Sequence, residues 1–247
     1  MRDGALRIAM WSGPRNISTA MMRSFGSRAD TVVSDEPFYA AYLAMTGIDH
    51  PMKNEVIAAG ETDPRKVEEM LLAPLPAGRR VFYQKHMTHH MIEGIGRDWI
   101  DRVTNVFLIR DPNRVLASYV RKREAVDASD VGFLKQEEIF DRVADRLGEA
   151  PPVIDSHDVL ADPEGTLTAL CERLGLDFDR CMLAWEPGIR TTDGVWAHHW
   201  YQSVAASRGF SPPPAVEPAP LPPHLLHIAE AVRPAYDKLR AHRIAAG

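Results

Sequence analysis

Short apolar runs alternate along the chain with segments whose apolar positions have helical spacing. The runs occupy residues 6–11, 31–34, 80–85, 104–110 and 152–156, and several of them are almost continuously hydrophobic. Such runs are typical of strands that are buried on both faces of a parallel sheet. Strands that alternate with helices predict an α/β fold, a three-layer sandwich in which a central, mostly parallel sheet is flanked by helices.

Three of the helical segments begin with the same signal, an Asp-Pro pair at residues 63–64, 111–112 and 162–163. An aspartate at the N-cap accepts hydrogen bonds from free backbone N–H groups, and proline fits the first helical position. Gly175 marks the expected end of the third of these helices, because glycine favours the left-handed conformation found there.

The 247 residues are enough to bury a sizeable core as one domain. We expect this α/β domain over residues 1–210. Residues 211–223 are rich in proline and predict an extended connector. Residues 224–247 predict a C-terminal helical arm that packs on the domain, with a kink at Pro234.

Composition and charge argue against several classes of protein. Apolar residues make up 45% and charged residues 26%, as in a globular protein, and the formal net charge of −5 disfavours nucleic acid or an anionic membrane as partner. Two cysteines outside any CxxC pair indicate a reducing compartment, so we expect a cytoplasmic protein. The apolar run at residues 6–11 is too short for a signal peptide, and we expect no membrane span.

The segment "SGPRNIST", residues 12–19, connects the first expected strand to the first expected helix. At such a junction, backbone N–H groups and the helix dipole form an anion site. Gly13 permits close backbone approach, Arg15 supplies a cation, and the hydroxyls of Ser18 and Thr19 are suited to capping the helix. Ser18 and Thr19 stand where an ATP-binding loop needs glycine and lysine. On its own, an ordinary strand-to-helix turn explains this segment equally well.

A second junction of this kind lies at "FLIRDPNRVLASYVRK", residues 107–122. Arg110 ends the strand, at the edge where open α/β sheets bind ligands, and Ser118 follows eight residues later. At roughly 100° per residue, one helix face carries Val115, Ser118, Tyr119 and Lys122. Taken alone, Arg110 is more simply explained by a salt bridge, and Ser118 by a position on the helix surface. These simpler explanations become less convincing because the chain has two junctions of the anion-binding type.

Together these segments resemble the two nucleotide-binding signatures of the sulfotransferase family, whose members use 3′-phosphoadenosine 5′-phosphosulfate (PAPS). The family's 5′-phosphosulfate loop commonly reads Pro-Lys/Arg-Ser-Gly-Thr/Ser-Thr; Pro14, Arg15, Ser18 and Thr19 agree with it, whereas Asn16 and Ile17 replace a small residue and a glycine. Arg110 and Ser118 have the spacing of the family's 3′-phosphate motif. Residues 155–179 are similar to a third family segment, in which an acidic Asp-Leu type pair precedes DPxxxLxxLxxxLGLxF.

The resemblance implies a P-loop NTPase-like sulfotransferase fold and a reaction with PAPS as donor, PAP as product and no metal. Residues 13–19, with Arg110 and Ser118, would bind the nucleotide. Arg15 and the loop N–H groups would stabilise the leaving phosphate, as preorganised donors do for developing charge. Ile17 departs from the pattern, and its bulk predicts either a displaced loop or a lost activity.

An acceptor hydroxyl or amine must lose a proton as it attacks sulfur. Glu36 follows the second expected strand, where some relatives place a glutamate as base. Lys85 and His86 end the third strand, where other relatives place Lys-Thr-His, with the histidine as base. His86 comes one residue early, and strand alternation would turn it to the opposite face. We therefore expect Glu36 as base, His86 as second candidate and Lys85 as electrostatic partner of the sulfate.

Two simpler explanations stand beside these roles. Glu36 is also the kind of acid favoured at a helix N-terminus. The three histidines at positions 86, 89 and 90 lack the glutamate of a zinc motif, so we predict no metal site and expect them to form a polar pocket wall.

Residues 190–210 contain an aromatic segment with few aliphatic residues. Its rings belong to Trp196, His198, His199, Trp200 and Tyr201. Rings with polar tips suit stacking on an adenine or on an apolar acceptor, so the segment predicts a nucleotide cover or an acceptor wall. A C-terminal subcore that pins the arm explains it equally well. The aromatic residues Phe38, Tyr39 and Tyr42 are expected on the acceptor side.

The sequence thus predicts an enzyme, a sulfotransferase that moves a sulfuryl group from PAPS to a hydroxyl or amine of a small-molecule acceptor. A P-loop kinase-like phosphotransferase is one alternative, although it would need magnesium and a loop lysine. A non-catalytic binder of nucleotide or sulfated ligand is the other, which Ile17 favours. We expect no nucleic-acid or membrane partner and allow for a homodimer.

Overall fold

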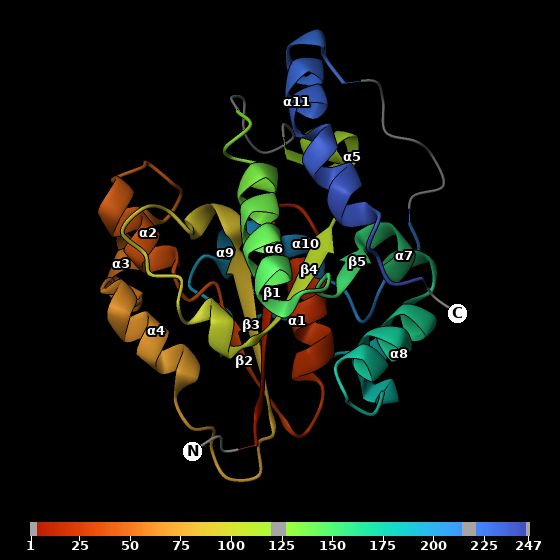
Figure 1. Cartoon of the computed structure of the whole chain (residues 1–247). Helices are drawn as coiled ribbons and strands as arrows, with labels where there is room; N and C mark the ends of the chain where they lie inside the picture. Colours follow the sequence, from red (N-terminus) through yellow and green to blue (C-terminus); the bar gives the residue numbers. More distant parts are fainter. Residues whose placement is uncertain (1–3, 120–126, 214–220, 246–247) are drawn as a thin grey trace.

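Five parallel strands form the centre of the computed structural model, which describes residues 4–119, 127–213 and 221–245. Their order across the sheet is β2-β3-β1-β4-β5 (Figure 1). The strands are β1 (Leu6–Ser12), β2 (Thr31–Asp35), β3 (Val81–Met87), β4 (Thr104–Ile109) and β5 (Val153–Asp155), and every pair is parallel. All five apolar runs are therefore strands of one sheet, and the predicted α/β fold is confirmed.

The helices of the described residues connect and flank these strands. They are α1 (Ser18–Gly26), α2 (Tyr39–Thr46), α3 (Lys53–Ala59), α4 (Pro64–Leu72), α5 (Pro112–Tyr119), α6 (Phe133–Leu147), α7 (Ser156–Ala161), α8 (Pro163–Arg173), α9 (Ala197–Trp200), α10 (Gln202–Ala205) and α11 (Pro223–Arg240). Three short 3₁₀ turns add η1 (Thr88–His90), η2 (Ile100–Arg102) and η3 (Arg180–Leu183).

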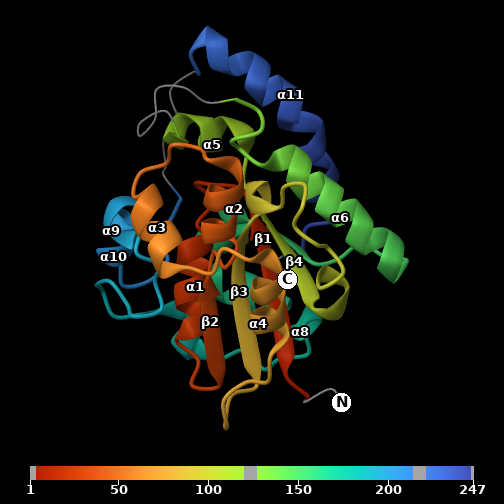
Figure 2. The same ribbon diagram turned by 90° about the vertical axis from the view of Figure 1, so that its left-hand side faces the viewer.

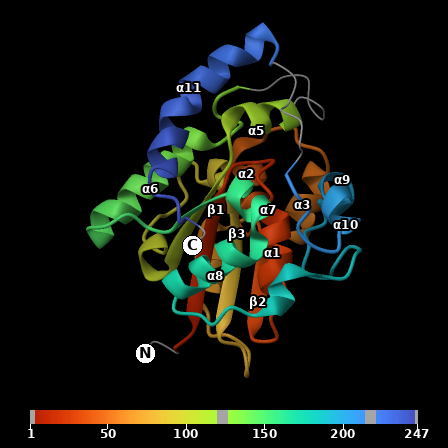
Figure 3. The same cartoon turned by 90° about the vertical axis from the view of Figure 1, so that its right-hand side faces the viewer.

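The side-chain alternation of β1 separates two cores. Ile8 and Met10 pack in one cluster with side chains of α1, α7 and α8, the layer in front of the sheet in Figure 3. Ala9 and Trp11 pack in the other, with side chains of α4, α5, α6 and α11, and Figure 2 shows α4 and α6 on that side. Because both faces of the sheet are covered, its strands are apolar at consecutive positions.

The C-terminal helix α11 lies against α6 and α5 (Figure 1). It runs through Pro234, and the Tyr236 hydroxyl donates a 2.8 Å hydrogen bond to Asp155 at the end of β5. Of the expected connector 211–223, residues 214–220 lie outside the described residues. Within the described part of the chain, no helix has the length and apolarity that crossing a membrane requires.

The three Asp-Pro pairs begin helices as predicted. The side chains of Asp63, Asp111 and Asp162 accept 2.9 Å hydrogen bonds from backbone N–H groups in the first turns of α4, α5 and α8. Gly175, just beyond α8, has φ of 68°, the left-handed conformation that glycine favours. These caps fix where each helix leaves the sheet and so where the loops at its edge lie.

The cap at Asp162 provides a test of this assignment. Asp162→Ala removes the acceptor of the Gly165 N–H, and we expect the free energy of unfolding to fall by about 0.5–2 kcal/mol, as for other N-cap losses. Urea denaturation measures the change. Asp162→Asn keeps a capping oxygen and should retain most of the stability. Equal losses for the two variants would contradict the capping role.

Candidate functional site

The loop between β1 and α1 is held tightly against the sheet. A Cβ atom on Gly13 would lie 2.4 Å from the backbone oxygen of Val131, so only glycine fits there. The Asn16 amide donates a 2.7 Å hydrogen bond to the backbone oxygen of Leu108 in β4. The buried Oδ1 of Asn16 has no hydrogen-bond partner among the described residues. The loop is therefore anchored and still carries a free buried polar atom.

The backbone of this loop has the form of an anion-binding turn. Arg15 and Ile17 have φ of 61° and 45°, on either side of Asn16, which lacks positive φ. Alternation of this kind turns successive N–H groups into one concave surface. The N-cap of α1 is Ile17, and no side chain caps the helix. The expectation that Ser18 or Thr19 caps α1 is therefore wrong, and the first N–H groups of the helix face the loop instead.

The structure also accounts for Ile17. The left-handed conformation at this position is the one that a glycine adopts at least cost, and a β-branched residue there carries strain of about 1–3 kcal/mol. The Ile17 side chain is half-buried and packs on the core cluster beneath α1. This packing offsets the strain, so the bulk of Ile17 is compatible with a backbone conformation that glycine would adopt.

The junction between β4 and α5 meets the first loop directly. Nη1 of Arg110 donates a 2.6 Å hydrogen bond to the backbone oxygen of Arg15. Nε of Arg15 in turn donates to Oγ of Ser118 at 3.1 Å. Arg15 thus contacts Ser118, 103 positions away in the sequence, and Arg110, 95 positions away, and the three residues form one chain of contacts. Lys122, expected on the same face of α5, lies outside the described residues.

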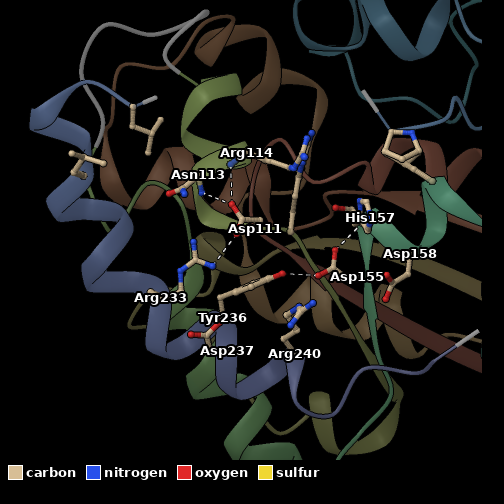
Figure 4. A pocket seen from close by; sticks show the side chains of 16 residues that line it. Asp111, Asn113, Arg114, Asp155, His157, Asp158, Arg233, Tyr236, Asp237 and Arg240 are labelled. Atoms are coloured by element: carbon tan, nitrogen blue, oxygen red, sulfur yellow. Dashed lines mark hydrogen bonds and ion pairs between the residues drawn. The ribbon is translucent and has the colours of Figure 1, made fainter. Parts of the chain in front are cut away.

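A cavity of about 630 Å³ begins at Arg110 and extends between α5, α7 and α11 (Figure 4). Its polar lining includes Arg114, Arg233 and Arg240, with Asp155 and His157 at the end of β5. Burial raises the pKa of Asp155, whose carboxylate accepts hydrogen bonds from the His157 N–H and the Tyr236 hydroxyl. The full lining holds four arginines and four aspartates, so the cavity next to the second loop carries both charges in equal number.

A buried ammonium group lies at the other end of the sheet edge. Lys85 is 1% exposed, and its Nζ donates to Oδ1 of Asp35 at 2.8 Å, to Oε1 of Glu36 at 2.5 Å and to the Tyr201 hydroxyl at 2.7 Å. The register Asp35↔Lys85 across β2 and β3 places the two side chains on one face. Glu36 follows directly, with φ of 45°. We call these four side chains the Lys85 network.

The charges of the Lys85 network shift the pKa values of its members. Burial raises the pKa of the Glu36 carboxyl, and the neighbouring Asp35 adds to this, against the opposing effect of Lys85. Burial alone would lower the pKa of Lys85, but Asp35 and Glu36 together hold it well above its ordinary value. The network thus contains a charged ammonium and a carboxyl that takes up a proton more readily than usual.

The histidines near β3 lie in two different places. His86 points to the opposite face of the sheet, stacked on Trp11 at 4.6 Å, and burial lowers its pKa to about 3. His90 lies on the side of the Lys85 network, with Nε2 4.0 Å from Oε2 of Glu36, stacked between Tyr39 and Tyr42. Burial lowers the pKa of His90 as well, so both rings are neutral.

The aromatic segment after residue 190 reaches into the Lys85 network. The Tyr201 hydroxyl lies 2.8 Å from both oxygens of Asp35 and accepts from Nε1 of Trp196. The Gly194 N–H donates to Oδ2 of Asp35 at 3.1 Å. Trp196 and Tyr201 also pack with Tyr39, Tyr42 and Leu43 of α2. The sequence marked this segment as aromatic but did not indicate that one of its hydroxyls meets Lys85.

The structure thus groups the predicted residues in two places. Arg15, Arg110 and Ser118 meet at the two loops, and Lys85 meets Glu36. His86 is separate from both, within an apolar stack. Sequence reasoning did not predict the contact of the Tyr201 hydroxyl with Lys85, 116 residues away, or the buried ion pair between Arg23 and Asp193. A lysine that is buried with two acids needs further hydrogen-bond acceptors, and this need was the signal that could have indicated another polar partner.

Comparisons with known proteins identify the family of this chain. A family model described as "Sulfotransferase domain" matches residues 6–242. "Branched-chain-amino-acid aminotransferase-like protein 1" and "protein 2" of Arabidopsis thaliana are each 35% identical over 95% of this chain. The chain spans only 42% and 41% of their lengths, so their names describe longer proteins.

Three solved structures share the fold. The sulfotransferase domain from the Synechococcus PCC 7002 olefin synthase has a TM-score of 0.53 at 17% identity, covering 94% of this chain and 97% of its own. The sulfotransferase domain from the curacin biosynthetic pathway has a TM-score of 0.51 at 17% identity, covering 93% of this chain and 98% of its own. The sulfotransferase from Alicyclobacillus acidocaldarius has 0.59 at 13%, covering 97% of both. With the family match over nearly its whole length, the chain belongs to the sulfotransferase domain family.

Proposed function

We propose that this protein transfers a sulfuryl group from PAPS to a hydroxyl or amine of a small-molecule acceptor. One observation carries the proposal. The contacts from Arg110 to Arg15 and from Arg15 to Ser118 join the two anion-type loops into a single site. A donor with a 5′-phosphosulfate and a 3′-phosphate presents two anionic groups to match them.

The chain's own residues fit such a donor. The concave backbone at Arg15 and Ile17, with the uncapped N-terminus of α1, suits the 5′-phosphosulfate. Arg110 and Ser118 are assigned to the 3′-phosphate. The cavity of about 630 Å³ that begins at Arg110 lies within the roughly 300–1,000 Å³ of small-molecule sites, so it has room for the nucleoside part.

Glu36 is the base that the geometry favours. Its side chain is 11% exposed, at the carboxyl end of β2, whereas His86 faces an apolar stack on the other face of the sheet. Burial and Asp35 raise the pKa of Glu36, and a raised pKa makes a carboxylate a better proton acceptor near neutral pH. Glu36 would take the proton from the acceptor as its oxygen or nitrogen attacks sulfur.

Lys85 and Tyr201 are assigned to positioning Glu36. Lys85 is 1% exposed and shares its three protons among Asp35, Glu36 and the Tyr201 hydroxyl. The ammonium group held in this way fixes Oε1 of Glu36. The other carboxylate oxygen, Oε2, lies 4.0 Å from Nε2 of His90 and is left for the acceptor. The sequence-based assignment of Lys85 to the sulfate itself becomes a role exerted through Glu36.

The assignment of Arg110 predicts a nucleotide preference. Wild-type protein should bind PAP more tightly than AMP, which lacks the 3′-phosphate, and Arg110→Ala should remove about 1.5–3 kcal/mol of PAP affinity, the usual range for a charge-assisted hydrogen bond. AMP affinity should change little. Isothermal titration calorimetry measures both, with Arg102→Ala, an exposed arginine, as control.

Two results would contradict the function. Equal wild-type affinities for PAP and AMP would remove the 3′-phosphate site. Binding of ATP only with magnesium, and none of PAP, would instead favour a phosphotransferase.

The Lys85 network predicts an unequal effect of two similar substitutions. Tyr201→Phe leaves buried Lys85 and Asp35 short of a partner, so the free energy of unfolding should fall by about 2–3 kcal/mol. Tyr39→Phe removes the hydroxyl that lies 2.9 Å from Nδ1 of His50 and should cost about 1 kcal/mol. Urea denaturation compares them. A Tyr201→Phe loss no larger than that of Tyr39→Phe would contradict the role of Tyr201.

A further inference from the structure

A second cavity, of about 660 Å³, lies on the free edge of β2 and shares no residue with the two anion loops. It is bounded by the second half of α1, the first residues of β2 and the start of the aromatic segment. Its lining consists of Met22, Arg23, Gly26, Thr31, Val32, Val33, Pro76, Arg79, Arg190, Thr191 and Thr192. The proposed function assigns nothing to it.

The charge of this lining is one-sided. Three arginines line the cavity, Arg23, Arg79 and Arg190, and no aspartate or glutamate does. The whole chain has a formal net charge of −5, so the excess of cations is local and runs against the overall balance. The nearest compensating acid is Asp193, whose Oδ2 is 2.5 Å from Nη2 of Arg23. Three cations against one anion leave a surplus of two positive charges.

The guanidinium group of Arg23 is incompletely satisfied. Arg23 is 1% exposed, yet its Nε and Nη1 have no hydrogen-bond partner among the described residues. Buried polar groups normally have partners, so such donors indicate that something else completes the site. Burial lowers the pKa of Arg190, and the positive charge of Arg23 lowers it further against the opposing effect of Asp193. An anion between them would relieve that repulsion.

The shape of the cavity limits what the anion is. A Cβ on Gly26 would lie 3.2 Å from Val33 and 3.7 Å from Nη1 of Arg190, so the glycine leaves room beneath that guanidinium. Thr191 and Thr192 add hydroxyl donors beside the arginines. Met22 and Val33 form an apolar wall. The planar guanidinium group of arginine donates paired hydrogen bonds that match the oxygens of phosphate and sulfate. The apolar wall can contact an organic group attached to such an anion.

We propose that this cavity binds the phosphate or sulfate monoester group of a small organic molecule. The anionic group lies between Arg23 and Arg190, with Arg79 at the mouth, where its Nη1 is tied to the backbone oxygens of Ala29 and Thr31. The organic part lies against the apolar wall. The site is separate from the donor loops and does not depend on the proposed transfer reaction.

The cavity is also connected to the Lys85 network through the chain. Oδ2 of Asp193 accepts from the Arg190 N–H at 2.8 Å and from Arg23, and the next residue, Gly194, donates to Asp35. A ligand held by Arg190 therefore binds one end of the segment whose other end carries Tyr201. Occupancy of the cavity would stabilise the segment that holds Glu36 in place.

Calorimetry with phenyl phosphate and inorganic phosphate, both with PAP saturating the donor loops, tests the proposal. Phenyl phosphate should bind with one site per chain, and at least about tenfold more tightly than inorganic phosphate, because apolar contact adds to the shared anion contact. Arg190→Ala should weaken phenyl phosphate at least about tenfold, which corresponds to a lost charge-assisted hydrogen bond. Arg80→Ala, an exposed neighbour outside the lining, should have no effect.

Two further measurements keep the outcomes distinct. PAP affinity measured on Arg190→Ala should equal that of wild type, which separates this site from the donor site and shows that the variant is folded. Selenate soaked into crystals with PAP should give an anomalous peak beside Arg190. No peak there, equal phenyl phosphate affinity of Arg190→Ala and wild type, or equal binding of the two phosphates would overturn the proposal, whatever the fate of the transfer reaction.

Discussion

The Lys85 ammonium group is the point on which the candidate site depends. It lies almost fully buried between two carboxylates of consecutive residues and a phenol from a distant part of the chain. Burial of an unpaired ammonium would cost many kcal/mol, so Asp35, Glu36 and Tyr201 are held where they are by the need to satisfy it. Burial raises the pKa of the Glu36 carboxyl, and the second carboxylate, Asp35, adds to this against the opposing effect of Lys85.

Backbone strain is concentrated at the same edge of the sheet. Among the described residues, positive φ without glycine occurs at Arg15, Ile17, Glu36 and Met52, and the first three belong to the candidate site. Such conformations persist only where the surroundings enforce them. The Asn16 bond to β4, the Ile17 side chain on the core and the Glu36 N–H bond to the Lys85 oxygen supply that enforcement. The fold therefore holds both the loop between β1 and α1 and the proposed base, Glu36, in preset positions.

Local patterns in the sequence predicted most of the fold, because continuous apolar runs, Asp-Pro caps and Gly175 act over a few residues. The contact of Arg15 with Ser118 was not predicted as such, although the carboxyl ends of parallel strands share one edge and so bring the two loops together. Tyr201 could not be predicted, since its partner Lys85 is 116 residues away and no local signal specifies that contact. The bulk of Ile17 suggested a displaced loop or a lost activity, whereas only three-dimensional packing shows where this side chain lies on the core.

The protonation of Glu36 tests the account most directly. Carboxyl carbons labelled with ¹³C in glutamate can be titrated by NMR, and the Glu36 signal is identified as the one missing from Glu36→Gln. The account predicts that this carboxyl titrates above the ordinary value of 4.5, because burial and Asp35 outweigh the attraction of Lys85. A Glu36 signal that titrates at or below the ordinary value would contradict the claim that the Lys85 network prepares this carboxylate as a base.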